Sequence, residues 1–140
     1  MALSVRDVMT PEVETTTSSQ LLQEAARSMK DGDFGSIPVV DDGRLVAVLT
    51  DRDIVIRAVA EGLDASTTQV GQVASSDPVT VSPDQSLDDA VEIMTHYQVR
   101  RLPVVDEGQL VGVLSQADIA LEAKEKLTGE VVQEISQPSA

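Results

Sequence analysis

The chain has 140 residues with 24 acidic and 10 basic side chains, which gives a formal net charge of −14 at pH 7. A surface this acidic argues against binding to nucleic acid or to an anionic membrane, because both attract basic proteins. Cysteine is absent, which excludes disulfide scaffolds, thiolate metal sites and cysteine nucleophiles.

The N-terminal residues 1–7 contain no basic stretch followed by an apolar one, so we expect no signal peptide. No apolar run approaches the length of a membrane span. These two observations predict a cytoplasmic protein that has no membrane partner.

The chain repeats itself once. Residues 37–54 correspond in order to residues 102–119, an offset of 65, and the register extends back to Val5 and Val70. A unit of about 65 residues buries only a marginal core by itself. We therefore expect the two units to pack on each other as a pseudo-twofold pair. The predicted divisions are unit 1 over 1–64, unit 2 over 65–128 and a C-terminal tail over 129–140.

Each unit is predicted to begin with a short strand, over 13–16 and 79–81, followed by a helix. The patterns Thr17-x-x-Gln20 and Ser82-Pro83-x-Gln85 are typical of capping boxes at a helix start. Gly32 is expected to end the first helix, and the second is expected to end at residue 96 or 97. The predicted apolar faces are Leu22, Ala25, Ala26 and Met29, and Leu87, Ala90, Val91 and Met94.

Next in each unit come two β-branched runs around the turn residues 41–44 and 106–109, which predict a hairpin. The runs are nearly continuous, so both faces of the sheet are expected to be covered. A second helix is predicted to begin at Thr50 and at Ser115. Its expected apolar stripes are Ile54, Val55, Ala58 and Val59, and Ile119, Ala123 and Leu127.

Residues 62–71 are expected to link the units, and the tail is expected to add a short amphipathic helix around residues 131–135. The fold class is therefore α/β (α+β), with two β-α-β-β-α units packed sheet to sheet.

The order of elements, together with x-Pro-Val-Val-Asp and Gly-h-h-Ser/Thr-x-x-Asp, resembles the CBS domain over residues 4–127. The segments at 49–56 and 99–106 carry most of that resemblance. Two in tandem resemble a CBS pair, or Bateman module, and in particular the stand-alone bacterial two-CBS proteins of the hypoxic response protein type. The resemblance implies a homodimer. It also implies clefts for AMP, ADP, ATP, S-adenosylmethionine or NAD(H), with no required cofactor.

The hydroxyl and carboxylate pairs Thr50/Asp53 and Ser115/Asp118 have two interpretations. Each pair can cap a helix. Alternatively, a helix N-terminus attracts phosphate, the hydroxyl adds a hydrogen bond, and the carboxylate accepts from a ribose diol. The recurrence in both units and the resemblance favour ligand contact, with Ser115 at phosphate and Asp118 at ribose.

The resemblance further implies that adenine lies between aliphatic side chains and backbone groups. The matching residues are Thr15, Thr16, Ser36, Ile37 and Pro38 in unit 1, and Thr80, Val81, Arg101, Leu102 and Pro103 in unit 2. The side chains of Ile37 and Leu102 are also expected to pack in the core. Phe34 is predicted to pack in the interior rather than against a base.

Arg100 and Arg101 are the predicted phosphate ligands of unit 2, and Arg52 is that of unit 1, because guanidinium groups bind phosphate in bidentate fashion. The alternative is that these arginines only offset nearby carboxylates. The family pattern has glycine at Gly112, whereas unit 1 has Ala47. A methyl group there is predicted to crowd the ligand, so the Asp118 site is expected to bind more tightly.

His96 is the sole histidine, and it gives no metal prediction. No nucleophile, base and orienting group can be assembled, so an enzyme such as a nucleotide hydrolase is disfavoured. The leading prediction is a regulatory module that binds an adenosyl ligand and signals to a separate, unknown protein. The alternative is a ligand-free dimeric interaction module.

Overall fold

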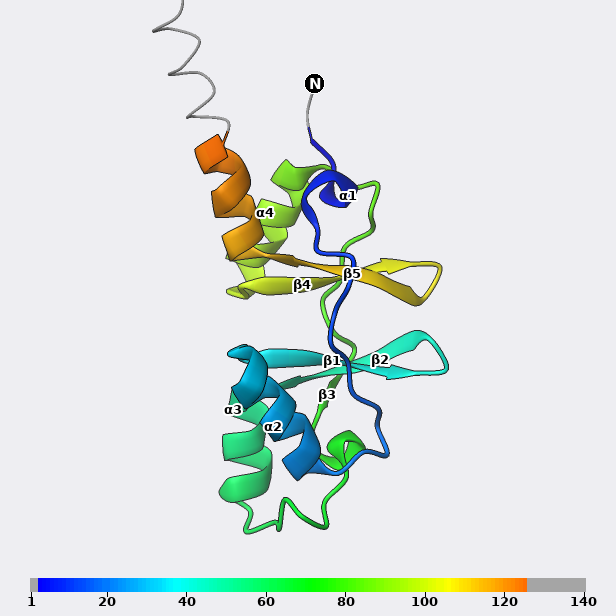
Figure 1. The fold of residues 1–140 in the computed structure, drawn as a ribbon, viewed down its shortest axis with the longest axis vertical. Helices are drawn as coiled ribbons and strands as arrows, with labels where there is room; N and C mark the ends of the chain where they lie inside the picture. The colour runs from blue at the N-terminus through cyan, green and yellow to red at the C-terminus, as the bar shows by residue number, and fades with distance from the viewer. Residues whose placement is uncertain (1–2, 126–140) are drawn as a thin grey trace, which may run out of the picture.

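The computed structural model describes residues 3–125 as two helix-and-hairpin units that face each other through their strands. Figure 1 shows the layers: α2 (Leu22–Gly32) and α3 (Asp51–Asp53) at one end, two hairpins in the middle, and α4 (Leu87–Tyr97) with the helix over 116–125 at the other end. This arrangement confirms the expected fold class.

The first hairpin consists of β1 (Ser36–Asp41) and β2 (Arg44–Thr50), and the second of β4 (Arg101–Asp106) and β5 (Gln109–Ser115). The strand order is β1-β2-β5-β4, and β2 meets β5 only through the pair Arg44 and Gln109 near the two turns. The short β3 (Ser75–Ser76) pairs with β2. The hairpins therefore touch at their tips and leave space between their bodies.

Both hairpin turns use the same backbone geometry. Asp42 and Gly43 have φ of 52° and 80°, and Glu107 and Gly108 have φ of 52° and 81°. Two successive left-handed residues match the right-handed twist of the flanking strands, and a glycine at the second position meets that demand without strain. The predicted hairpins are confirmed, each with a register shift, after Val39 and after Val104.

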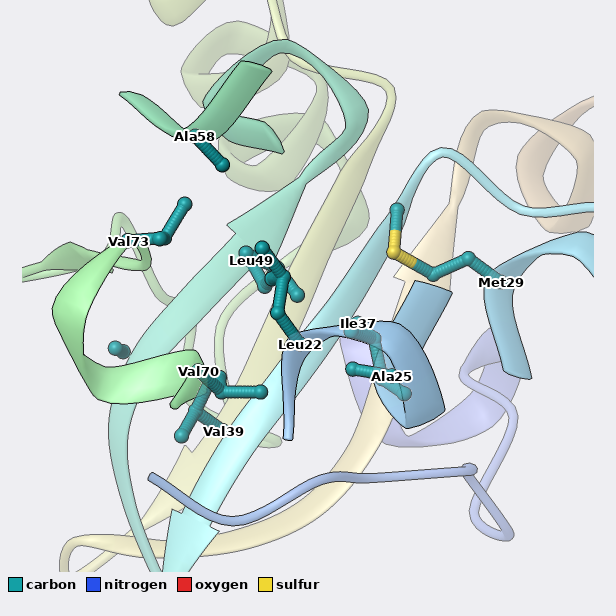
Figure 2. Packing of buried hydrophobic residues seen from close by; sticks show 10 residues of the cluster. Leu22, Ala25, Met29, Ile37, Val39, Leu49, Ala58, Val70 and Val73 are labelled. Atoms are coloured by element: carbon teal, nitrogen blue, oxygen red, sulfur yellow. The ribbon is translucent and has the colours of Figure 1, made fainter. Parts of the chain in front are cut away.

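Each unit has its own core, and each core includes residues from the other predicted unit. The first core includes Val70 and Val73 around the short helix η2 (Val70–Gln72), as Figure 2 shows. The second includes Val5 from α1 (Val5–Val8), with Val8 packed against it. The predicted boundary between residues 64 and 65 stays a prediction. In the packing, Val70 and Val73 of predicted unit 2 join the first core, and Val5 of predicted unit 1 joins the second.

Several local expectations were wrong. Residues 13–16 and 79–81 form single bridges rather than strands, Thr16 to Val39 and Val81 to Val104. Each of these segments has one neighbouring strand, so it lies at the margin of its hairpin. Helix α2 begins at Leu22 and α4 at Leu87, after the predicted caps. In place of a helix start, the Thr17 and Ser82 carbonyls accept from the amides of Gln20 and Gln85 and close a turn.

The predicted helix ends are confirmed, whereas the apolar stripes differ from expectation. Helix α2 ends at Gly32 and α4 at Tyr97, and the left-handed residues that follow them are Asp33 and Gln98. Helix α3 continues into the π-helical segment η1 (Ile54–Val59), which shifts side-chain spacing. Expected stripe residues that prove to be exposed are Val55, Val59, Val91 and Ala123. Leu127 and the predicted tail helix lie outside the described residues.

The turn before α2 is tied to the end of β1. The Ser18 hydroxyl donates to the Asp41 carboxylate at 2.6 Å and the Ser18 amide at 3.1 Å, and these two bonds hold the pKa of Asp41 below its ordinary value. The stabilisation is present above the unfolded-state pKa and is lost as pH falls through the lower, folded-state value.

Candidate ligand-binding cleft between the two units

A cleft of about 880 Å³ lies between the hairpins, within the usual range for small-molecule sites. Its walls come from both hairpins and from residues 75–79. The repeat is visible in the walls, since Pro38 and Val48 have their equivalents Pro103 and Val113 in the same lining. A ligand here would contact both units at once.

Nine of the residues predicted from sequence line this cleft. They are Ser36, Pro38, Thr50, Arg52, Arg100, Arg101, Leu102, Pro103 and Ser115. The structure therefore brings together both hydroxyl positions and all three predicted phosphate ligands.

The cleft is nearly neutral on a strongly acidic chain. Its charged lining residues are three arginines and three aspartates: Arg52, Arg100, Arg101, Asp33, Asp51 and Asp77. The whole chain has 24 acidic against 10 basic residues, so positive charge is concentrated here. This local balance lowers the repulsion that an acidic protein exerts on an anionic ligand.

The two hydroxyl and carboxylate pairs form the same capping box. In unit 1 the Asp53 amide donates to Thr50 Oγ1 at 3.0 Å, and the Thr50 amide donates to Asp53 Oδ2 at 3.1 Å. In unit 2 the Asp118 amide donates to Ser115 Oγ at 3.0 Å, and the Ser115 amide to Asp118 Oδ2 at 3.1 Å. Each hydroxyl accepts a bond in this arrangement, so its own proton can still be donated to a ligand.

Each carboxylate also accepts from a hydroxyl that sequence reasoning missed. Ser75 Oγ donates to Asp53 Oδ1 at 2.9 Å, and Thr10 Oγ1 lies 3.2 and 3.3 Å from the two oxygens of Asp118. Thr10 and Ser75 are equivalent in the repeat, so the offset that aligned the pairs could have identified them too.

The two carboxylates differ in exposure. Asp53 is 8% exposed, and Arg57 Nε lies 3.9 Å from its Oδ1. Asp118 is partly exposed. The Asp53 carboxylate is therefore less accessible to a ligand than the Asp118 carboxylate.

The helix starts beside the cleft also differ. In unit 1 the Arg52 amide donates to Asp51 Oδ1 at 2.8 Å, so a carboxylate of the chain itself occupies the helix N-terminus. Unit 2 has Gln116 at the position of Asp51. Over residues 3–125, no acceptor is found for the amide of Ala117. The second helix start therefore keeps a donor for an incoming anion.

The remaining predicted site residues do not line this cleft. Ile37 and Val81 lie in the first and second cores, and Thr16 is buried with its hydroxyl donating to Gln20 at 2.7 Å. Thr15 and Thr80 are exposed beside them. Asp53 and Asp118 are each bonded to a hydroxyl partner that lines the cleft, Thr50 and Ser115, and do not line it themselves.

The reason for a glycine at position 112 differs from the one predicted. A Cβ atom on Gly112 would lie 2.8 Å from the Thr10 carbonyl oxygen and 2.9 Å from Met9 Sδ. The glycine therefore makes room for the N-terminal segment of the chain rather than for a ligand. The equivalent Ala47 is buried opposite Ser76 of β3.

Phe34, predicted to pack in the interior, is half-buried against the first core and also lines the cleft.

His96 is exposed in the last turn of α4 and meets Tyr97 edge to face. Within the described part of the chain, no group of three or more His, Asp or Glu side chains could hold a metal ion, and no helix is long and apolar enough to cross a membrane.

The CBS domain family model matches residues 5–59 and 70–125, so the chain belongs to the CBS domain family and carries two copies. Proteins built from such pairs are regulatory modules.

Similar curated proteins support the same assignment. The chain is 46% identical over 118 residues to the CBS domain-containing protein YhcV of Bacillus subtilis, covering 84% of each chain. It is 38% identical over 138 residues to hypoxic response protein 1 of Mycobacterium tuberculosis, covering 98% of this chain and 96% of that protein.

Solved structures share the fold. Hypoxic Response Protein I, determined with two coordinated zinc ions, superposes with a TM-score of 0.77 at 39% identity, covering 84% of this chain and 97% of that one. The CBS pair of protein MJ0100, in complex with 5′-methylthioadenosine and S-adenosylmethionine, superposes with a TM-score of 0.77 at 25% identity, covering 90% and 99%.

Proposed function

We propose that this protein is a regulatory module that binds an adenine nucleotide in the cleft between its two CBS units. The observation that carries the proposal is the start of the helix over 116–125. Ser115, the amide of Ala117 and two adjacent arginines meet there at the wall of a cleft of ligand size. The adenosyl ligands in the MJ0100 pair support the ligand class.

In this proposal the Ser115 hydroxyl and the helix N-terminus bind the phosphate, because both offer donors and the helix adds a partial positive charge. Arg100 and Arg101 supply guanidinium groups from β4 and the residue before it. Asp118 accepts from the ribose hydroxyls, in exchange for its long bond with Thr10. Thr50 and Asp53 carry the same roles in unit 1.

We further propose that the unit 2 site binds more tightly than the unit 1 site. The Asp51 carboxylate at the first helix start repels a phosphate and already satisfies the Arg52 amide. Gln116 in the equivalent position is neutral.

The preference among nucleotides follows from charge as well. Three arginines against three aspartates in the cleft favour AMP over ATP unless a divalent cation accompanies the phosphates.

A thermal-unfolding panel tests the proposal. AMP, ADP, ATP with and without magnesium, S-adenosylmethionine and NADH are added to the purified protein. A ligand at 100 times its dissociation constant stabilises the folded state by about 2.7 kcal/mol, which raises the melting temperature by roughly 5–10 °C in a chain of this size. A shift with AMP is expected, and the absence of any shift at millimolar ligand would contradict the proposal.

The signal would reach a separate protein, and the module would act as a homodimer in the cytoplasm. Exposed apolar side chains on the outer helices support self-association: Val55, Val59, Val91 and Leu121. Sedimentation equilibrium is expected to return twice the mass of one chain, and a monomer mass at micromolar concentration would contradict the dimer.

The net charge of −14 supports the absence of nucleic-acid and anionic membrane partners.

One observation favours the alternative of a ligand-free interaction module. Asp53 and Asp118 already have hydrogen-bond partners in the chain, so their carboxylates can serve as caps alone. This alternative predicts that Asp118→Ala lowers the melting temperature and changes no binding, because no ligand contacts the residue.

A further inference from the structure

One aromatic contact crosses the cleft. The Arg101 guanidinium carbon lies 5.5 Å from the centroid of the Phe34 ring, within the range of a cation–π interaction. Phe34 comes from the segment between α2 and β1 in unit 1, and Arg101 begins β4 in unit 2. Both residues line the cleft.

The Phe34 ring is held in place while its partner is not. One edge of the ring lies against Gly32, where a Cβ atom would collide with it, and the side chain packs against the first core. Arg101 is exposed, and its side chain makes no ion pair within residues 3–125. The guanidinium group can therefore leave the ring without breaking a salt bridge.

The contact is present once, although the fold is repeated. By the offset of 65, Val99 is equivalent to Phe34 and Ser36 is equivalent to Arg101. The reverse pairing thus has neither an aromatic ring nor a cation. Any ligand recognition by this pair has a fixed direction across the cleft, with the ring in unit 1 and the cation in unit 2.

We propose that Phe34 binds the planar base of the ligand by stacking, which displaces the Arg101 guanidinium toward the ligand phosphate. The inference rests on the proposed nucleotide function and adds that the ligand base replaces Arg101 on the Phe34 ring. In the free protein Arg101 covers the ring. In the complex the base covers the ring, and Arg101 is paired with an anion.

Relative strengths favour the exchange. A cation–π contact at an exposed site shifts an equilibrium by about 2- to 5-fold. Stacking of a base on an aromatic side chain contributes about 5- to 150-fold, and the displaced guanidinium gains a charge-assisted contact with phosphate. Because Arg101 is opposite Ser115 in the β4–β5 register, its backbone already lies beside the proposed phosphate position. The base and the phosphate would then bind different units and join them.

Titration calorimetry with AMP and with ribose 5-phosphate, which has no base, separates stacking from phosphate binding. Phe34→Leu is expected to weaken AMP binding about 10-fold and to change ribose 5-phosphate binding by less than about 2-fold. Phe34→Tyr, which keeps the ring, is expected to restore AMP binding to within about 3-fold. Arg101→Gln is expected to weaken both ligands.

Ile54→Ala is the matched control, because Ile54 packs against the same core as Phe34 and does not line the cleft. Phe34→Trp adds a second readout, since the chain has no tryptophan: AMP is expected to quench its fluorescence, and ribose 5-phosphate is not.

Two outcomes overturn the inference and are distinguishable from failure of the proposed function. If wild-type protein binds AMP and Phe34→Leu binds it equally well, or loses both ligands to the same extent, the stacking role is wrong while nucleotide binding stands. If wild-type protein binds neither ligand, the proposed function is wrong and the exchange with it.

Discussion

Asp118→Asn is expected to weaken AMP binding by about 10- to 100-fold and to leave the fold largely intact. The Asp118 carboxylate is partly exposed, and its bonds to Thr10 are long, at 3.2 and 3.3 Å. An amide keeps one oxygen for the Ser115 amide, so the cap survives. Loss of a charged acceptor for ribose hydroxyls removes hydrogen bonds worth about 1.5–3 kcal/mol. Titration calorimetry of wild-type and variant protein measures the difference.

Asp53→Asn is the matched variant, and the expected balance is reversed. Asp53 is buried, accepts from the Thr50 amide and from Ser75, and lies near Arg57. An amide there replaces a charged acceptor within the protein, which is expected to lower the free energy of unfolding by about 1–3 kcal/mol. The effect on AMP binding is expected to be smaller than that of Asp118→Asn. Equal losses of AMP affinity, or a larger loss from Asp53→Asn, would contradict the unequal sites.

Gln116→Asp is expected to weaken AMP binding by about 10-fold or more. This change gives unit 2 the carboxylate that Asp51 supplies in unit 1, where it accepts from the next backbone amide at 2.8 Å. A negative charge at the helix start competes with phosphate for the Ala117 amide and repels it directly.

Adenosine is the matched ligand for this variant, because it has the same base and ribose and no phosphate. Its affinity is expected to change by less than about 2-fold. If adenosine and AMP lost affinity to the same extent, the variant would have distorted the site rather than introduced a repulsive charge.

The overall architecture was predictable because it follows from the sequence repeat and from the residues of the turns. The repeat placed equivalent hairpins in both units, and both turns have a glycine, Gly43 and Gly108, at the second left-handed position. Pro38 and Pro103 lie on β1 and β4, the outer strands of the sheet, where a missing amide is tolerated.

The helix starts were less predictable because one sequence motif can form two structures. Thr17-x-x-Gln20 has the sequence of a capping box but closes a turn, and helix α2 begins later, at Leu22. The exposed Val55 and Val59 show a different limit, since a π-helical segment changes which side chains share a face.

The recurring hydroxyl positions, the arginines and the family resemblance together predicted nine of the residues that line the candidate cleft. Most of what sequence reasoning missed depends on distant contacts. Thr10 donates to Asp118 from the other end of the chain. The Asp51 contact is local, but only the structure shows that its carboxylate accepts from the Arg52 amide. The role of Gly112 was likewise misassigned, because nothing in the local sequence reveals that Met9 and Thr10 approach it.

The most direct test is a crystal structure of the protein grown with AMP. The account predicts electron density for the phosphate at the start of the helix over 116–125, beside Ser115 and the two arginines, with the ribose at Asp118. Density for AMP away from the cleft would contradict the account. So would a cleft without AMP density in crystals grown at a saturating AMP concentration.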